Sequence, residues 1–325
     1  MRLTIGYLTY RLHPRFEWFC ASLARELRSM PDISPSEIQV VVIDGRLWYD
    51  EHRHLGMYDA AIVPHVDGLG SSIKFEHHTP KPNALQGPFR QTSRDYFCAA
   101  SARNTAFAYA RAGHVAFVDD LSVLLPGWLK AHIHAADNGY VLAGTTCKQR
   151  RIIVNSHGDL ASFEEFRLGR DSRLDRLTED LQDCTGGWLF GGTFSVPLDL
   201  ALNVNGQDEI HDTIGGEDYD FGTRLERAGA CIRISRLCGT YEDEMAHHAE
   251  APMIRIDQPW AGPDGPYASN YLYNKMRREP SRTWTIGNTY KLRDVRTQVL
   301  GGLGFPSVPK EDLLYWVDGR RLRDM

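Results

Sequence analysis

Residues 101–129 read SARNTAFAYARAGHVAFVDDLSVLLPGWL, and this stretch decides the fold class of the chain. Residues 101–112 have the small-residue composition of a tightly packed helix. Residues 115–118 (VAFV) form a short apolar run typical of a buried strand, and Asp119 and Asp120 follow where that strand ends. In open α/β sheets, ligands bind just outside the carboxyl ends of the strands. We therefore expect a functional site at this acid pair.

The acid pair itself allows two interpretations. Carboxylate oxygens are the ligands that Mg²⁺ or Mn²⁺ prefers, so Asp119 and Asp120 could hold a cation that binds a diphosphate. Taken alone, the pair also fits a turn before the next helix, because Asp and Ser122 are good turn residues ahead of Pro126.

The N-terminal residues predict a βαβ opening. Residues 3–10 have the pattern of a strand, and residues 16–28 have that of an amphipathic helix. Residues 38–43 read as a second strand, which ends at Asp44. Strands that alternate with helices in this way predict an α/β fold with a parallel sheet.

Three further segments carry weaker signals. Residues 59–63 suggest a short third strand, and residues 67–91 are rich in Gly, Pro, Ser and His, as in a long functional loop. Residues 163–181 carry acids and arginines at helical spacing, which predicts a solvated helix with ion pairs.

Length and composition set broad limits. The 325 residues can hold one large α/β domain with an appendage, or two domains. The longest apolar runs are strand-sized, and no secretory signal follows Arg2, so we expect a cytoplasmic protein without a membrane span. The cysteines are scattered without a Cys-x-x-Cys pair, which suits reduced thiols better than disulfides or zinc. They are Cys20, Cys98, Cys147, Cys184, Cys231 and Cys238.

A second group of acids lies in the second half of the chain. Gly215 and Gly216 precede Glu217, Asp218, Tyr219 and Asp220, and a helical run then ends at Gly229. Acids are favoured in a first helical turn by the helix dipole, so an ordinary charged helix start explains one or two of them. A catalytic loop that enters a helix is the alternative, with Asp220 as a helix-turn acid.

The C-terminal part is mildly basic, although the formal net charge of the chain is -5. From Ile256 to the end, eleven Lys or Arg stand against eight Asp or Glu, among several Trp and Tyr residues. Such a mixture can contact phosphates and stack on bases or sugars. A solvated helix face with core aromatics is the alternative interpretation.

Taken together, these motifs resemble the GT-A-fold nucleotide-sugar glycosyltransferases. The segment from Ser101 to Leu129 resembles the core that carries the acid motif of that superfamily. Gly191-Gly192, residues 204–206 and the GGEDYD stretch at 215–220 are similar to the β-1,4-galactosyltransferase-like and polypeptide N-acetylgalactosaminyltransferase-like subgroup. The agreement covers roughly residues 1 to 250. It implies a Rossmann-like, open, mostly parallel sheet flanked by helices, with a GT-A domain at 1–255 and a C-terminal extension at 256–325 that binds the acceptor or packs on the main domain.

The resemblance also implies roles on the donor side. Asp119 and Asp120 match the acids that bind the metal, Mn²⁺ or Mg²⁺, and the nucleotide sugar, which the resemblance expects to be UDP-linked. Asp44 matches the strand-end acid that contacts the uracil or ribose, and Arg103 is expected to steady the nucleotide. His248 fits the Met-x-x-His spacing of a further metal ligand, with His247 as the alternative.

On the acceptor side, the resemblance implies that Glu217 binds the acceptor and that Asp218 is the base of an inverting transfer. Gly216, Tyr219 and Trp188 are the expected substrate-binding residues, and the two aromatic side chains offer flat surfaces to sugar rings.

Two positions depart from the family pattern. Leu121 stands where a third acid is common, which bears on metal binding, and Ile214 replaces a tryptophan that shapes the acceptor pocket. The sequence thus predicts a metal-dependent hexosyltransferase, with a non-catalytic GT-A domain that binds a nucleotide or glycan as the alternative. The expected acceptor is a glycan, a small molecule or hydroxylated bases in DNA. The basic C-terminal part is the reason for including DNA.

Overall fold

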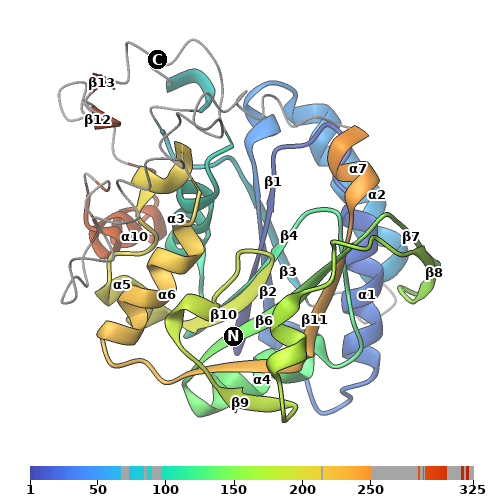
Figure 1. Ribbon diagram of the computed structural model, residues 1–325. Helices are drawn as coiled ribbons and strands as arrows, with labels where there is room; N and C mark the ends of the chain where they lie inside the picture. The colour runs from blue at the N-terminus through green and yellow to red at the C-terminus, as the bar shows by residue number, and fades with distance from the viewer. Residues whose placement is uncertain are drawn as a thin grey trace.

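The protein is built around one twisted sheet, as a computed structural model shows (Figure 1). The structure describes residues 1–66, 73–83, 86–89, 97–213, 215–249, 285, 288, 290–305, 316–317 and 320–321. Within these residues nine strands form the sheet, in the order β3-β2-β1-β4-β10-β6-β11-β5, with β9 paired to β11. Strands β1, β2, β3, β4, β6 and β11 run one way, and β5, β9 and β10 run the other way. The predicted mostly parallel α/β sheet is confirmed.

The strands of the main sheet are β1 (Leu3–Thr9), β2 (Ile38–Asp44), β3 (Lys74–His78), β4 (His114–Asp119), β5 (Ser122–Leu124), β6 (Val141–Gln149), β9 (Leu181–Asp183), β10 (Thr193–Pro197) and β11 (Ile232–Asp243). The helices are α1 (Phe16–Arg28), α2 (Glu51–Val66), α3 (Ala99–Tyr109), α4 (Trp128–Asn138), α5 (Leu198–Asn203), α6 (Glu217–Arg227), α7 (Glu244–Ala249) and α10 (Leu292–Leu300).

Helices cover both faces of the sheet, which explains why the central strands are apolar on both sides. Along β1, Leu3, Ile5 and Tyr7 face the core under α1, α2 and α4, whereas Leu8 faces the core under α3, α5, α6 and α10. Figure 1 shows α1 and α2 on one side of β1 and β4, and α3 and α6 on the other. Because β1, β2, β4, β6 and β11 run in the same direction, their carboxyl ends lie at one edge of the sheet.

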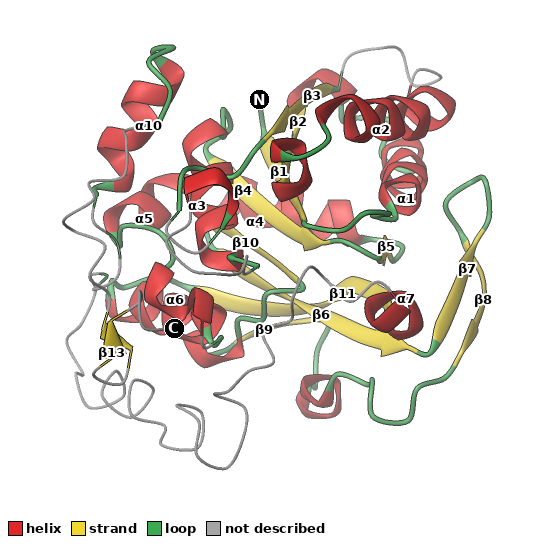
Figure 2. Ribbon diagram, turned by 90° about the horizontal axis from the view of Figure 1, so that it is seen from above, coloured by secondary structure: helices red, strands yellow, loops and turns green. Residues whose placement is uncertain are grey.

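A smaller antiparallel pair stands apart from the main sheet. It consists of β7 (Arg151–Val154) and β8 (Leu160–Glu164), and it lies beside α7 (Figure 2). A second two-stranded pair joins β12 (Trp316–Val317) to β13 (Arg320–Arg321).

Three local predictions were wrong. Residues 59–63 belong to α2, because Leu55, Tyr58 and Ala61 repeat at helical spacing from Glu51 onward. Of the predicted loop at 67–91, the structure describes residues 73–83 and 86–89, and this part contains β3, which pairs in parallel with β2 and ends at the two histidines. Residues 163–181 form the end of β8, a short 3-10 turn and the start of β9. The chain turns at Gly169, whose N–H donates to the Phe166 carbonyl, and Asp171 caps the 3-10 turn that follows.

The described part of the C-terminal region packs on the main body of the protein. Helix α10 lies against α3, and the side chains of Leu292 and Val295 are buried there. In the part of the chain that the structure describes, every helix is too short or too polar to span a membrane.

Candidate functional site

The first acid pair lies where expected, at the carboxyl end of β4. Asp119 is the last residue of β4, and Leu121 turns the chain into β5 with a positive φ of 60°. The side chain of Leu121 is buried, and its carbonyl accepts from the N–H of Asp243 at 3.2 Å. The position where a third acid is common therefore points into the core and cannot serve the site.

Asp120 is held by the segment that follows β1. Its Oδ2 accepts from the Thr9 hydroxyl at 2.7 Å, and Arg11 Nε lies 3.0 Å from Oδ1. Burial raises the pKa of Asp120, whereas Arg11 and the Thr9 hydrogen bond lower it. Sequence reasoning assigned Arg11 and Thr9 no role. The signal was an arginine two residues beyond a strand that ends at the same edge as Asp120.

Asp119 faces the other way and is the more open of the two acids. About a third of its side chain, 35%, is exposed, and its Oδ1 lies 3.2 Å from the guanidinium of Arg103. Burial raises the pKa of Asp119 to about 7, Arg103 lowers it, and Glu242, Asp120 and Glu217 raise it further. The acid thus lies in a concentration of negative charge that a cation would relieve.

The second acid group begins α6. Gly215 and Gly216 have φ values of 74° and 81°, the left-handed region that glycine adopts most easily, so the expected glycine turn is present. Asp218 accepts from the N–H of Gly191 at 2.7 Å through Oδ2 and from the N–H of Tyr219 through Oδ1. Burial raises the pKa of Asp218 to about 6, Glu217 raises it further, and Arg103 lowers it.

Arg103 joins the two acid groups. Its side chain is only 3% exposed, and it donates to Glu217 at 2.9 Å and to Asp119 at 3.2 Å. It also donates to the carbonyl of Gly191 at 3.0 Å. Acids that lie about a hundred residues apart in the sequence are thereby connected by one side chain.

Asp44 ends β2, as predicted, but its contacts are internal. The side chain is fully buried, and Oδ1 accepts from the N–H of Arg46 at 2.7 Å. Oδ2 lies 3.4 Å from Nε2 of His77 on the neighbouring strand. Asp44 therefore caps the turn after β2 in this conformation.

The aromatic residues of the acceptor side differ in exposure. Trp188 is partly buried against the core under α6, and the Tyr219 ring packs over Gly187. Phe190 is the exposed ring, at 50%, and the Arg173 guanidinium lies 4.2 Å from its centroid. Sequence reasoning missed Phe190, although its place directly before Gly191-Gly192 was a usable signal.

The predicted metal site is incomplete among the described side chains. His247 and His248 lie on α7, but their side chains are outside the described part of the structure. Where side chains are described, no three His, Cys, Asp or Glu groups lie close enough to hold a metal ion. Asp120 already accepts from Thr9 and Arg11, so the described residues alone do not fit a divalent cation.

The loop from Asn205 to Asp212 is hydrogen-bonded to the N-terminal half of α3. Asp212 accepts from the N–H groups of Ala100 and Ser101, in the first turn of α3, at 2.7 and 3.1 Å. Asn104 donates to the carbonyl of Gln207 at 2.8 Å. These contacts fix the helix that carries Arg103, and sequence reasoning assigned them no role.

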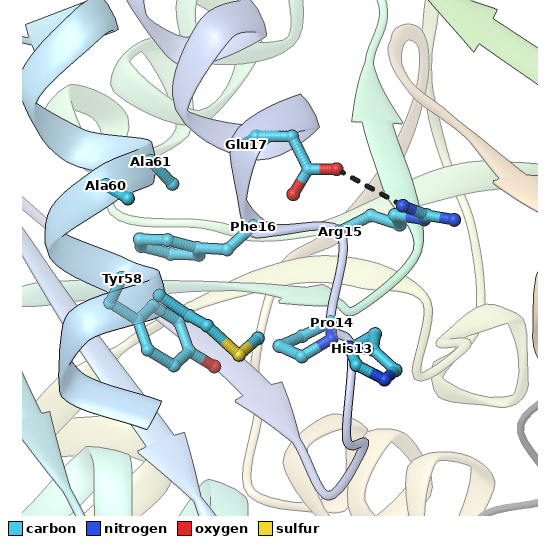
Figure 3. Close-up of a pocket in the computed structure, with 9 residues that line it drawn as sticks. His13, Pro14, Arg15, Phe16, Glu17, Tyr58, Ala60 and Ala61 are labelled. Carbon is cyan, nitrogen blue, oxygen red and sulfur yellow. Dashed lines mark ion pairs between the residues drawn. The ribbon is translucent and has the colours of Figure 1, made fainter. Parts of the chain in front are cut away.

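One cavity lies beside the same sheet edge, between the start of α1 and the middle of α2 (Figure 3). It measures about 340 Å³. Tyr58 is one of its lining residues, and the buried hydroxyl of Tyr58 has no hydrogen-bond partner among the described residues. Arg15 and Glu17 form an ion pair of 3.6 Å at this cavity. Its lining residues are His13, Pro14, Arg15, Phe16, Glu17, Met57, Tyr58, Ala60 and Ala61. The candidate acids do not line it.

The comparisons with known proteins identify the fold. No protein-family model matches the chain, and no curated protein matches its sequence. Among solved structures, S. aureus TarS 1-349 in complex with UDP-GlcNAc is similar, with a TM-score of 0.54 and 14% identity over 93% of this chain and 71% of that chain. The complex of TarS 1-349 with UDP gives 0.52 and 15% over 93% and 70%. A structure of TarS gives 0.52 and 14% over 93% and 43%.

The chain thus spans between 43% and 71% of the length of these TarS chains. At this low identity the likeness shows the fold alone. The predicted fold class is confirmed: the chain has a GT-A-like α/β fold, a mostly parallel sheet flanked by helices.

Proposed function

We propose that this chain is a hexosyltransferase that moves a sugar from a UDP-linked donor to a hydroxyl acceptor. The observation that carries the proposal is the link from Asp119 through Arg103 to Glu217, which brings two acid groups together at the carboxyl edge of the sheet. The GT-A-type fold supports the donor class, because similar structures are complexes with UDP and UDP-GlcNAc.

Asp218 is the base of the proposed reaction, with Glu217 as the ligand of the acceptor. With a pKa near 6, Asp218 is a carboxylate at neutral pH and takes the proton of the acceptor hydroxyl. The acceptor oxygen then bonds to the anomeric carbon as the bond from that carbon to the diphosphate oxygen breaks on the opposite face. The electron pair of the broken bond leaves with UDP, and the configuration is inverted. The Gly191 N–H keeps Asp218 oriented for this step.

The metal requirement is a separate part of the proposal. A divalent cation, when bound, supplies positive charge to the leaving diphosphate. The residues that would hold it are Asp120 and either His248 or His247, and Arg11 would compete with the cation for the Asp120 carboxylate. We expect turnover to stop in EDTA and return with Mn²⁺ or Mg²⁺, and we expect Asp120→Asn to lose that recovery. Turnover that persists unchanged in EDTA would reject the metal requirement and leave the transfer itself standing.

The hydrogen bonds from Arg11 and Thr9 to Asp120 favour one alternative, a GT-A domain that binds a nucleotide or glycan without turnover. When Asp120 is paired with Arg11 and bonded to Thr9, its carboxylate is already occupied, as expected in a domain that binds no cation. This alternative predicts UDP binding without release of UDP from any donor.

The acceptor classes remain a glycan, a small molecule or hydroxylated bases in DNA. Phe190 supports a ring-shaped acceptor group, because an exposed aromatic face can stack on a sugar or a base. The basic tail that motivates the DNA option lies mostly outside the described residues. The DNA option predicts that a tail truncation weakens salt-sensitive DNA binding.

A panel of nucleotide sugars tests the proposal. Each donor is incubated with the protein and Mn²⁺ or Mg²⁺, and nucleotide release and thermal stabilisation are measured. We expect a UDP-hexose to give both signals. Stabilisation without release across the panel would support the non-catalytic alternative, and a preference for a donor without uridine would overturn the role of Asp44.

A further inference from the structure

Arg103 contacts three groups that belong to different parts of the proposed site. One nitrogen, Nη1, donates to Glu217 Oε1 at 2.9 Å, and the other, Nη2, donates to Asp119 Oδ1 at 3.2 Å and to the Gly191 carbonyl at 3.0 Å. Only the fork of an arginine has enough donors in fixed directions to reach all three at once.

We propose that Arg103 is a positioning residue that sets the distance between the donor-side and acceptor-side acids and orients Asp218 through Gly191, without contacting either substrate. The inference rests on the proposed glycosyl transfer. It differs from the expectation that Arg103 steadies the nucleotide, and the two roles predict different measurements.

Gly191 is the relay in this arrangement. Its carbonyl accepts from Arg103, and its own N–H donates to Asp218 at 2.7 Å, so two hydrogen bonds connect the guanidinium to the proposed base. A Cβ at Gly191 would lie 2.5 Å from Nη2 of Arg103. The absence of a side chain is what allows the guanidinium to approach this backbone.

The burial of Arg103 argues against a contact with the nucleotide. The residue is 2% exposed, and both terminal nitrogens already donate to protein oxygens. Nη1 also lies 3.4 Å from Oε1 of Gln207, on the loop that supports α3. A nucleotide phosphate would have to displace Asp119 or Glu217 to reach the guanidinium.

The pKa of Asp218 reports whether Arg103 acts on it, because Arg103 and Glu217 are the charged groups that shift that pKa in opposite directions. Glu217 lies beside it on α6, and Arg103 opposes Glu217 from α3. The 3-10 turn at Glu209–Thr213 packs against α6 and carries Glu209, His211 and Asp212. Glu209 is paired with Lys81, and His211 lies 4.0 Å from Asp220. Because these partners are not Arg103, we expect a substitution of Arg103 to leave both pairs in place. The other turn on α6, Gly186–Trp188, carries no titratable side chain.

The test compares Arg103→Met and Arg103→Lys with a matched control, Arg224→Lys. Arg224 is also fully buried, and it pairs with Asp220 on α6 at 2.7 Å without touching Asp119, Glu217 or Asp218 in any contact described above. Three quantities are measured on the full chain: the pKa of Asp218 by carbon NMR of labelled aspartate, assigned with Asp218→Asn; the pH profile of UDP-GlcNAc hydrolysis; and the affinity for UDP.

We expect Arg103→Met to raise the pKa of Asp218 by about one unit, because the opposing positive charge is lost. The acid limb of the pH profile should move upward by the same amount. Arg103→Lys keeps the charge and should leave the pKa nearly unchanged, yet kcat should fall about 100-fold because the acids lose their spacing. UDP affinity should be unchanged in both variants, and Arg224→Lys should change neither the pKa nor kcat.

Weaker UDP binding with an unmoved pKa of Asp218 would overturn the proposal in favour of a nucleotide contact. If Arg103→Met fails to fold, Gly191→Ala provides a second probe, because its new methyl group pushes on Nη2 while every charge remains. It should lower kcat as Arg103→Lys does, and wild-type kcat in Gly191→Ala would contradict the relay. If the wild-type protein releases no UDP from any donor, the proposed function fails, whereas the NMR measurement still decides the role of Arg103.

Discussion

Two adjacent carboxylates, Glu217 and Asp218, differ in their surroundings more than their positions in the sequence suggest. Glu217 is paired with Arg103, and Asp218 accepts only from backbone N–H groups in the hydrogen bonds described. Burial and the charge of Glu217 hold the pKa of Asp218 above its ordinary value. Neighbouring carboxylates of this kind take different roles when their environments push their pKa values apart.

This difference predicts the effect of Glu217→Gln on the pH profile of turnover. Glu217 raises the pKa of Asp218, so neutralising Glu217 should lower that pKa and move the acid limb of kcat/KM to lower pH. In the wild type, kcat/KM should rise about tenfold per pH unit below pH 6 and level off above it. The check is a profile of UDP-GlcNAc turnover from pH 4.5 to 8. A limb that moves upward in Glu217→Gln would contradict the assignment of Asp218 as the base.

Candidate site residues could be predicted from the sequence where an acid stands at the end of a strand or at the start of a helix. Asp119 and Asp120 end a strand, and Glu217 and Asp218 begin a helix after two glycines, so their locations followed from pattern alone. The contacts of these acids did not follow. Arg11 reaches Asp120 across more than a hundred residues of sequence, and only the pairing of β1 with β4 brings them together.

At the scale of the element, the start of α6 depends on the backbone conformation of Gly216. A Cβ built at Gly216 meets no atom within 4 Å, so a substitution there is opposed by backbone strain and not by crowding. The φ of 81° lies in the left-handed region, which asparagine tolerates better than alanine does.

We therefore expect Gly216→Ala to lower the free energy of unfolding by about 1–2 kcal/mol. Gly216→Asn should cost less, because its short polar side chain can hydrogen-bond locally. Urea denaturation of the three proteins measures both values. Equal stability of wild type and Gly216→Ala would show that this helix start does not need the left-handed conformation.

Elements were predictable where one signal dominated. The helix at Phe16–Arg28 and the strand at Ile38–Asp44 have a clear stripe or a clear apolar run, and both were found with nearly correct bounds. Residues 59–63 were misjudged because the four apolar residues that follow Asp59 fit a strand or part of a helix equally well. The charged segment at 163–181 was misjudged because charge spacing alone does not bury surface.

At the scale of the whole molecule, a buried network of hydrogen bonds connects the C-terminal region to the loop from Asn205 to Asp212. Lys81 pairs with Glu209 at 2.7 Å, and Tyr290 donates to the same carboxylate. Asn288 donates to the carbonyls of Asn205 and Gln207 at 2.9 Å. These contacts and the packing of α10 on α3 hold the described part of the C-terminal region against the main body of the protein.

A chain that ends at Arg255 should therefore be less stable than the full chain. It loses the burial of Leu292 and Val295, each worth about 1.5–3 kcal/mol, and leaves Glu209 without Tyr290. Thermal unfolding of both chains checks the difference. An unchanged melting temperature would indicate that residues 256–325 form a separate unit.

The central claim is that Asp218 takes a proton during sugar transfer from a nucleotide donor, and one comparison tests it most directly. UDP release from UDP-GlcNAc and equilibrium UDP binding are measured in the wild type and in Asp218→Asn, which keeps the size of the side chain. We predict that release falls about 10²–10⁴-fold in Asp218→Asn while UDP affinity is retained. Equal release in the two proteins, whether high or negligible, would contradict the claim.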